Sequence, residues 1–470
     1  MMPALRLLGL VIIGGLVTIG VMADQRERSI EELPSPVIAT ASDSRTGTWF
    51  CAGGSGTVGA ATVGLEVVNA GLDDATVDVQ VVQADTADGQ RAEVVVPAAS
   101  RVAVNLPQLA PEATWLGAIV ESDNPDVVLE QTFDGLSGTD RAPCATTTGT
   151  ALFAADGATR LLAEGESMTL VLMNPFQDDA IADVRFDADV GPDSIEAIVV
   201  PARRIVAIDV TEEVTVAARV HTSVEVTAGR LVANRLQVRN GTSVRGLAVT
   251  PLVQDGAVLS VIPIVATDSG LFDRIHVTNP SDEAAEVDLE IVTDGSVTLD
   301  PVELTIRAGR TVVVDVAVES RLAALPEFSV IARSLTGQPV AVAVERRVEL
   351  GGDLVAGTAA MGALDAAASE WIVASDGNVA ELSVVNPLAD TSAVVELWRV
   401  GGEGETLLSS IDLAPGRRQA LVAPDLDARD ILRVRATSPV VVGRASAGFT
   451  SRQMLGGVIA DGVVLLDQLD

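Results

Sequence analysis

The sequence predicts an all-β protein built from four tandem β-sandwich repeats that follow an N-terminal hydrophobic segment. Three observations lead to this prediction. Short Val-rich runs such as ATVDVQVV and AEVDLEIV alternate apolar and polar residues, which is the period of a half-buried strand. One motif recurs four times at nearly constant spacing. A single long apolar stretch without charges lies near the N-terminus.

The N-terminal stretch predicts export of the rest of the chain. Arg6 precedes 17 uncharged and mostly apolar residues, from Leu7 to Ala23, and the sequence then turns polar. This length exceeds the usual core of a cleaved signal, roughly 7–15 residues, and reaches the lower limit for spanning a bilayer. Small residues near its end would still suit a signal peptidase. We therefore expect residues 1–23 to be a membrane anchor or signal peptide, and residues 24–46 to be a linker.

Four asparagines mark the repeats, in the segments LEVVNAGLDD, LVLMNPFQDD, IHVTNPSDEA and LSVVNPLADT. These residues are Asn69, Asn174, Asn279 and Asn386, separated by 105, 105 and 107 residues. A turn related to V-P-A-x-x-R follows each asparagine and precedes a closing strand pattern. Such regularity indicates duplicated structural units. We expect the four repeats to span residues 47–148, 149–257, 258–366 and 367–470.

Each repeat has room for seven or so short strands, which favours an immunoglobulin-like β-sandwich. The alternative is an eight-bladed β-propeller with two blades in each repeat. The Asn-Pro step predicts a turn between strands, because proline cannot donate to a ladder and asparagine tolerates turn geometry. We therefore expect the four asparagines to be structural. We also expect the repeats to fold separately and to extend the protein additively.

Two cysteines, Cys51 and Cys144, lie at the two ends of the first repeat. In an exported chain, oxidising surroundings favour a disulfide between them, which would join the first and last strands of that repeat. Two unrelated buried thiols are the alternative. Two cysteines without a nearby histidine cannot complete a closed zinc site, so we expect no metal there.

Several of these motifs together resemble a known family. The opening WFCAGG, the V-x-N-P turn, the V-P-A-x-x-R turn and the S-x-x-P-V-V closing strand look like actinobacterial "large secreted proteins", exported envelope proteins built from such repeats. The chain departs from the pattern at Arg307, where other repeats have proline, and at Ala70, which follows the first motif asparagine. The resemblance implies an exported location and a repeat architecture. It implies no activity.

Composition excludes several functions. The net charge of −34 repels phosphate backbones, which argues against nucleic-acid binding. All 31 basic residues are arginines and tyrosine is absent, so mechanisms with a catalytic lysine or tyrosine are excluded. His221 and His276 lie in strand-like contexts, and we expect neither to be catalytic. Residues 187–194 carry three aspartates without the full EF-hand spacing, so a solvated loop is favoured over a calcium site. We expect no cofactor.

A non-catalytic scaffold or interaction protein of the cell envelope is therefore the favoured function, anchored to the membrane or secreted. Its partner would be an envelope protein or a wall polymer. Two alternatives stay open. A binding module for cell-wall polysaccharide or a partner protein would show a distinct surface on one repeat only. A carboxylate-dependent hydrolase would need two facing acids in a cleft, one with a raised pKa, and the sequence singles out no such pair.

Overall fold

The computed structural model describes most of the chain after residue 46. The described residues are 47–56, 61–136, 138–159, 166–214, 216–241, 244–266, 271–295, 299–322, 325, 327–349, 355–375, 381–422, 430–447, 452–456, 458–461 and 464–466. The anchor and linker predictions concern residues 1–46, which lie outside this described part. Among the described residues, no helix is long and apolar enough to cross a membrane.

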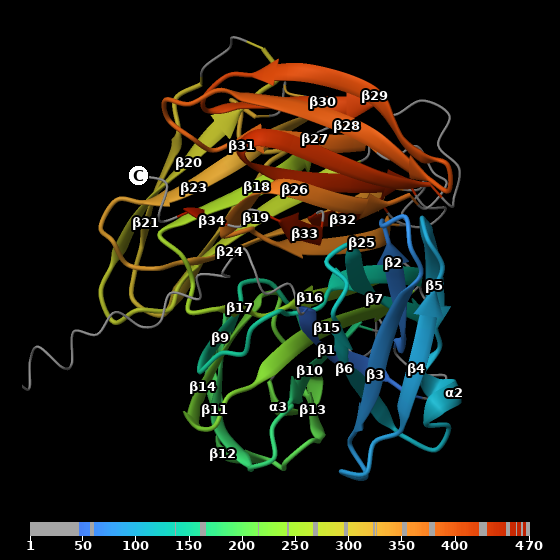
Figure 1. Ribbon diagram of the computed structural model, residues 1–470. Helices are drawn as coiled ribbons and strands as arrows, with labels where there is room; N and C mark the ends of the chain where they lie inside the picture. Colours follow the sequence, from blue (N-terminus) through green and yellow to red (C-terminus); the bar gives the residue numbers. More distant parts are fainter. Residues whose placement is uncertain are drawn as a thin grey trace, which may run out of the picture. The chain divides into compact units, whose positions relative to one another are not determined.

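Nearly all described elements are β-strands, which confirms the all-β prediction (Figure 1). Module 1 comprises β1 (Gly47–Ser55), β2 (Thr62–Asn69), β3 (Ala75–Gln83), β4 (Arg91–Val96), β5 (Ser100–Val104), helix α2 (Leu106–Leu109), β6 (Trp115–Ser122), β7 (Val127–Gly135) and β8 (Gly138–Pro143). Its strands form two layers in the orders β4-β3-β6-β1 and β5-β2-β7-β8. One parallel residue pair, between β1 and β2, joins the two layers.

Module 2 repeats this pairing. It comprises β9 (Ala151–Ala154), β10 (Glu166–Met173), β11 (Ala180–Ala188), β12 (Gly191–Val200), β13 (Ile205–Asp209), helix α3 (Val210–Glu213), β14 (Val220–Ala228), β15 (Val232–Asn240), β16 (Val244–Pro251) and β17 (Val253–Gln254). The two layers are β12-β11-β14-β9 and β13-β10-β15-β16, and the short β17 pairs with β9.

Module 3 has the same eight strand positions. They are β18 (Leu259–Ala266), β19 (Leu271–Asn279), β20 (Ala285–Val292), β21 (Val302–Ile306), β22 (Arg310–Asp315), β23 (Glu327–Ser334), β24 (Ala341–Glu349) and β25 (Val355–Gly362). Its layers are β21-β20-β23-β18 and β22-β19-β24-β25. The second layer continues across a parallel pairing of β16 with β25 into module 2.

Module 4 varies the plan in one respect, since one long strand belongs to both layers. The module comprises β26 (Ala366–Ala374), β27 (Glu381–Asn386), β28 (Ala393–Gly401), β29 (Gly404–Leu413), β30 (Arg417–Val422), β31 (Ile431–Ala447), β32 (Arg452–Gly456), β33 (Val458–Asp461) and β34 (Val464–Leu465). The N-terminal half of β31 pairs with β26 and β28, and its C-terminal half pairs with β27 and β32. Strands β33 and β34 pair with β26.

If the strand positions of each module are lettered a to h in chain order, all four modules show the same pairing. One layer has the order d-c-f-a and the other has the order e-b-g-h, and in module 4 the long β31 supplies both f and g. Eight positions per module exceed the seven or so expected. Each layer draws strands from both halves of its module, so these layers give no support to the propeller alternative with two successive blades in each repeat.

The residues of the b strands that precede each asparagine are buried on both faces, and in β10 this explains the unbroken apolar run LVLM. In β10, Leu170 and Leu172 pack in the core of module 2. Val171 and Met173, on the opposite face, belong to the apolar core that module 2 shares with module 1. The c strands instead alternate buried and exposed residues, as strands with one solvated face do.

At each junction, the outer face of an e-b-g-h layer packs against the d-c-f-a layer of the preceding module. Between modules 3 and 4, Val385 and Val441 share one cluster with Val261. Gly443 lies against Pro263 so closely that a Cβ at position 443 would approach the proline ring to 2.3 Å. A larger residue at position 443 would therefore force the two layers apart.

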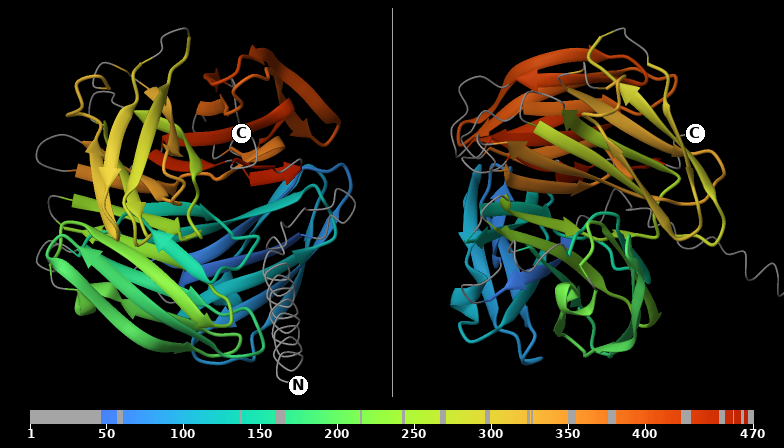
Figure 2. Two further views of the ribbon diagram at one scale, coloured as in Figure 1. Left: turned by 90° about the vertical axis from the view of Figure 1, so that its left-hand side faces the viewer. Right: turned by 180° about the vertical axis from the view of Figure 1, so that it is seen from behind.

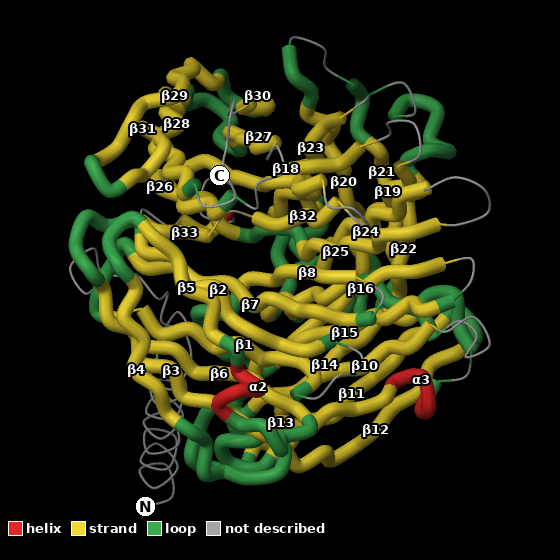
Figure 3. Tube along the Cα trace, turned by 90° about the vertical axis from the view of Figure 1, so that its right-hand side faces the viewer, coloured by secondary structure: helices red, strands yellow, loops and turns green. Residues whose placement is uncertain are grey.

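Module 1 packs on module 4 by the same rule, so the four junctions close a cycle. Val68 and Val128 of module 1 share an apolar cluster with Ile372 and Ile431 of module 4. The h strands follow this cycle, because β8 contacts β16, β16 pairs with β25, β25 contacts β32, and β32 contacts β8 (Figures 2 and 3). Arg45–Asp470 forms one compact unit. The expectation that the repeats extend the protein additively was therefore wrong.

The motif asparagines hold the two layers of each module together. Asn174 is fully buried, and its Nδ2 donates to the carbonyls of Asp178 at 2.8 Å and Val200 at 3.0 Å. Its Oδ1 accepts the N–H of Phe176 at 3.0 Å. Bonds of the same three kinds are formed by Asn69, Asn279 and Asn386. Because the asparagine ends strand b and its carbonyl partner ends strand d, each asparagine joins the two layers.

The predicted disulfide is confirmed within module 1. Cys51 of β1 is bonded to Cys144, which directly follows β8, with an S–S distance of 2.05 Å. The bond joins the first strand of the module to the chain just beyond its last strand. Both cysteines are buried, so the bond lies within the apolar core of the module.

Replacing Asn174 with alanine should lower the free energy of unfolding by about 3 kcal/mol, because three buried hydrogen bonds are lost at roughly 1 kcal/mol each. Urea unfolding of the two proteins measures the difference. Asn240→Ala is the matched control, since Asn240 is exposed and its loss should change stability by less than about 0.5 kcal/mol. Equal effects of the two substitutions would contradict the proposed role of Asn174.

Replacing both Cys51 and Cys144 with alanine should destabilise the protein by roughly 2–5 kcal/mol, the usual cost of losing a native disulfide in a small secreted domain. Thermal and urea unfolding measure this loss. Thiol titration of the denatured, unreduced wild type should detect no free thiol, since both cysteines are in the bond. Two titratable thiols per chain would show that the bond does not form.

Candidate functional site

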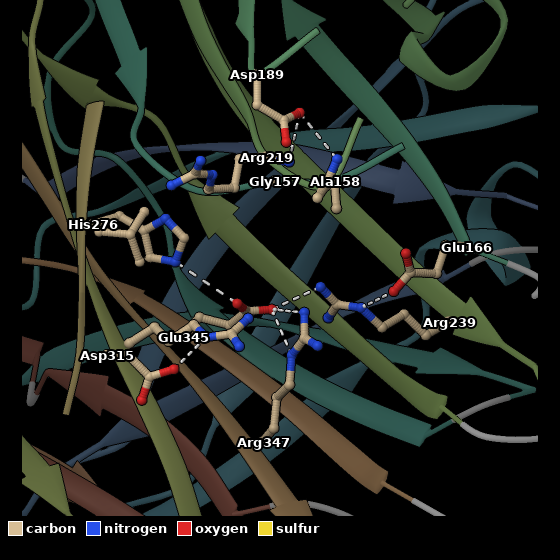
Figure 4. Close-up of a pocket in the computed structure, with 13 residues that line it drawn as sticks. Gly157, Ala158, Glu166, Asp189, Arg219, Arg239, His276, Asp315, Glu345 and Arg347 are labelled. Carbon is tan, nitrogen blue, oxygen red and sulfur yellow. Dashed lines mark hydrogen bonds and ion pairs between the residues drawn. The ribbon is translucent and has the colours of Figure 1, made fainter. Parts of the chain in front are cut away.

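A cavity of about 440 Å³ lies where module 2 meets module 3. Strands β10 and β15 of module 2 line it together with β19, β22 and β24 of module 3, and loops of module 2 complete the lining (Figure 4). Its volume falls in the range of small-molecule sites, roughly 300–1,000 Å³. Nine of its thirteen lining residues are ionisable, namely four arginines, four carboxylates and one histidine.

A chain of ion pairs forms the buried part of this lining. Arg239 donates from Nε to Glu166 at 2.8 Å and from Nη2 to Glu345 at 2.7 Å. Arg347 also donates to Glu345, from Nη2 at 3.1 Å. Glu166, Arg239 and Glu345 are 5%, 2% and 7% exposed. Because Arg239 belongs to module 2 and Glu345 to module 3, the same chain of ion pairs joins the two modules.

These neighbours keep Glu345 ionised. Burial alone would raise the pKa of Glu345, but the guanidinium of Arg239, that of Arg347 and the imidazole of His276 together hold its pKa well below the usual value. Burial lowers the pKa of Arg347, although an arginine remains protonated in a protein. A carboxylate with a lowered pKa is a poor proton donor at neutral pH. Glu345 therefore lacks the property that a hydrolase requires of its general acid.

Three buried atoms of the lining have no hydrogen-bond partner among the described residues. They are Oε2 of Glu166, Nη1 of Arg239 and Nε2 of His276. His276 Nε2 lies 3.7 Å from Glu345, which is too long for a hydrogen bond. Buried polar atoms in native proteins usually have a protein, water or ligand partner, because an unpaired one costs about 1–3 kcal/mol. All three atoms are buried, so this ion-pair chain leaves part of its hydrogen-bonding capacity unpaired.

More exposed charged groups complete the lining. Arg274 pairs with Asp315 at 3.3 Å, and both side chains are more than a third exposed. Asp189 accepts the backbone N–H groups of Ala218 at 3.1 Å and Arg219 at 3.4 Å. Figure 4 shows the Arg219 side chain on the same side of the cavity as His276. The four arginines balance the four carboxylates, so the lining carries no net charge when His276 is neutral.

His276, which we expected not to be catalytic, lines the cavity. The equivalent positions, three residues before each motif asparagine, hold Glu66, Val171 and Ser383. This difference between the repeats was the feature of the sequence that could have pointed to a site at His276. The motif asparagines and the two cysteines lie elsewhere within the described chain, in the cores of their modules.

The aspartates of residues 187–194 do not form a joint site. Asp187 pairs with Arg185 at 2.9 Å, and Asp193 accepts the N–H of Ser194. Asp189 instead lines the cavity. Among the described residues, no group of three or more His, Cys, Asp or Glu side chains is placed to hold a metal ion.

Two further buried groups titrate abnormally, outside the cavity. Burial raises the pKa of Asp140, in β8, to about 7, although it accepts the N–H of Val249 at 2.6 Å. Burial lowers the pKa of His221, in β14, to about 4, so the imidazole is neutral at pH 7 and hydrogen-bonds the Ala154 carbonyl through Nδ1. The carboxyl group with a raised pKa therefore lies at the junction of modules 1 and 2, not in the cavity.

Comparison with known proteins adds no function. No protein-family model matches the chain, and no curated protein sequence matches it. One solved structure that it resembles, a Thermotoga maritima protein described as Thermotoga maritima 1070, is 15% identical, with a TM-score of 0.21. The match covers 23% of this chain and 94% of that protein. A likeness at this level supports no argument about the chain.

Asp140 should make the protein less stable as the pH rises from 4 to 7. The folded chain keeps its proton up to about pH 7, whereas the unfolded chain loses it near the ordinary value of 3.8. The stability that this group contributes is complete below pH 3.8 and is lost as the pH rises through 7. The wild type should therefore lose up to about 4 kcal/mol relative to Asp140→Asn across this range.

Urea unfolding of both proteins at pH 4, 5.5 and 7 measures this difference. His221 acts in the opposite direction in both proteins and cancels in the comparison. Asp134→Asn, which changes an exposed aspartate of β7, serves as the control and should run parallel to the wild type. Parallel curves for Asp140→Asn and the wild type would contradict a raised pKa.

Proposed function

We propose that the protein is an exported, non-catalytic component of the cell envelope. In this proposal, four immunoglobulin-like repeats, in residues 47–148, 149–257, 258–366 and 367–470, form one scaffold that binds an envelope protein or a wall polymer. Residues 1–23 direct export as an anchor or a signal peptide. The Cys51–Cys144 disulfide supports an oxidising compartment. The resemblance to exported actinobacterial envelope proteins agrees with this location.

The observation that carries the proposal is the recurrence of the same cohesive features in all four modules. Each has the asparagine that joins its two layers, and each contributes an outer b–g face to a junction. A scaffold needs this repetition, whereas a catalytic site needs one module to gather reactive groups. The d strands are the outermost strands of their layers in every module. Such edges can pair with a strand of a partner protein.

A carboxylate-dependent hydrolase is less well supported. Of the acids in the cavity, Glu345 has a lowered pKa and is bound to two arginines. The acid with a raised pKa, Asp140, accepts a hydrogen bond at another junction. A binding role for the cavity itself is the second candidate, because its volume is that of a small-molecule site and nine ionisable side chains line it.

Cell fractionation tests the proposed location and role. The protein should appear in the membrane or wall fraction, or in the medium, and external protease should degrade the cell-bound form on intact cells. Incubation with isolated wall polysaccharide should release no new reducing ends. A protease-resistant cytoplasmic pool would contradict export. Release of reducing ends that Glu166→Gln abolishes would instead support the hydrolase.

A further inference from the structure

We propose that the cycle of junctions opens locally between modules 2 and 3, while the other three junctions stay closed. This inference goes beyond the scaffold role and does not depend on it. It rests on the residues that the four e-b-g-h layers present to their neighbours, on the solvent access of the cavity, and on the way the chain connects the two modules.

The outer faces of the four e-b-g-h layers can be compared at one equivalent position. The residue before each motif asparagine lies on this face and pairs directly with a residue of strand g. The four pairs are Val68–Val128, Met173–Val232, Thr278–Ala341 and Val385–Val441. Module 3 is the exception, because neither residue of its pair is a large apolar one. Its outer face is therefore the least suited to apolar packing at this position.

The apolar clusters that cross the junctions show the same difference. Those at the other three junctions contain valine, leucine or isoleucine from both modules. Among the described residues, the buried members of the cluster between modules 2 and 3 are three alanines, Ala155, Ala341 and Ala343, with Phe153 and Val253 partly buried beside them. Hydrophobic stabilisation grows with the apolar area that is buried, so apolar contact stabilises this junction least.

An ion pair does not replace the missing apolar contact. Arg239 donates to Glu345 across the junction at 2.7 Å. Desolvation of two buried charges offsets most of their attraction, so the pair aligns the two modules more than it holds them together. Ion pairs also cross other junctions, as between Arg444 and Glu130. The difference between the junctions thus lies in their apolar contacts.

Solvent already reaches the junction between modules 2 and 3. In the cavity lining, Asp189, Ala218 and Arg219 are exposed, and Arg274 and Asp315 are half-buried. Across this space of about 440 Å³, side chains of the two modules do not pack against each other. Opening would widen an existing gap and expose little additional apolar surface, so its free-energy cost is small compared with that at the other junctions.

The connection between modules 2 and 3 limits the opening. Asp255 donates its N–H to the Ala151 carbonyl of module 2 at 3.0 Å, and Ala257 exchanges two backbone hydrogen bonds with Val340 of module 3. Asp255 and the intervening Gly256 have φ angles of 58° and 64°. A few such turn residues absorb the backbone rotation in hinge motions. Because β16 also pairs with β25, the modules stay joined while their side-chain faces separate.

Thiol labelling of the purified full chain tests the proposal. Four variants each place one free thiol at the equivalent buried position of one module, because the two native cysteines are bonded to each other. They are Val68→Cys, Met173→Cys, Thr278→Cys and Val385→Cys. The probe is N-ethylmaleimide, a neutral reagent, and mass spectrometry follows the reaction. A buried thiol reacts only when its surroundings open, so the labelling rate reports the opening equilibrium.

The thiol at position 278 should react about tenfold faster than the other three, or faster still, since burial of one valine-sized side chain changes an equilibrium by about that factor. Equal rates at the four positions would overturn the proposal. A higher rate at any other position would place the weakest junction elsewhere and would also overturn it.

A second comparison separates local opening from global unfolding. Glu345→Gln removes a charged partner of Arg239 across the junction, so it should raise the labelling rate at position 278 about tenfold and leave the other three rates unchanged. Glu290→Gln, which changes a more exposed ion pair with Arg333 in module 3, is the matched control and should change none of the rates. A rise at all four positions in Glu345→Gln would indicate global unfolding and contradict the proposal.

Circular dichroism and a thiol count in urea establish that each variant is folded and carries one free thiol. If Thr278→Cys does not fold, Ala341→Cys replaces it, because Ala341 lies beside Thr278 on the neighbouring strand. If Glu345→Gln does not fold, the comparison of the four positions decides alone.

Discussion

Burial of both faces of each e-b-g-h layer is the constraint on which the rest of the structure depends. A strand such as β10 carries apolar residues on successive positions, so one face enters its own module and the other must be covered by a neighbour. Exposing those outer faces would cost about 25 cal/mol for each Å² of apolar surface. The modules therefore cannot stand apart, and their junctions are continuous with their cores.

Polar contacts at the junctions determine which module meets which. Arg444 of module 4 donates to Glu130 of module 1 at 2.6 Å, and Asn234 of module 2 donates to the Gly53 carbonyl of module 1 at 3.1 Å. Buried ion pairs contribute little net stability, because desolvation offsets their attraction, but a wrong pairing would leave a charge unpaired. Apolar contacts thus supply the attraction between modules. The polar contacts determine which two modules meet and how their faces are aligned.

Much of the fold could be predicted from the sequence, because its signals are local or repeated. Strand alternation predicted the all-β class, and the expectation of export together with two cysteines predicted the Cys51–Cys144 bond. Packing between repeats was missed, although runs such as LVLM already indicated strands buried on both faces. The cavity could not be predicted, because Glu166, Arg239, His276 and Glu345 lie on two repeats and meet only through the geometry of one junction. Only the odd histidine at a repeated position pointed to it.

The closed cycle of junctions fixes the copy number of the repeat. In an open solenoid each added repeat extends the stack, and the terminal repeats need specialised polar caps. Here modules 1 and 4 cover each other, so neither end of the array requires a cap. Repeats that use the same contact head to tail form a closed ring only when the rotation between neighbouring repeats matches the number of copies. Duplication or loss of a single repeat would therefore leave two apolar faces without a partner, which restricts how such a gene can change its length.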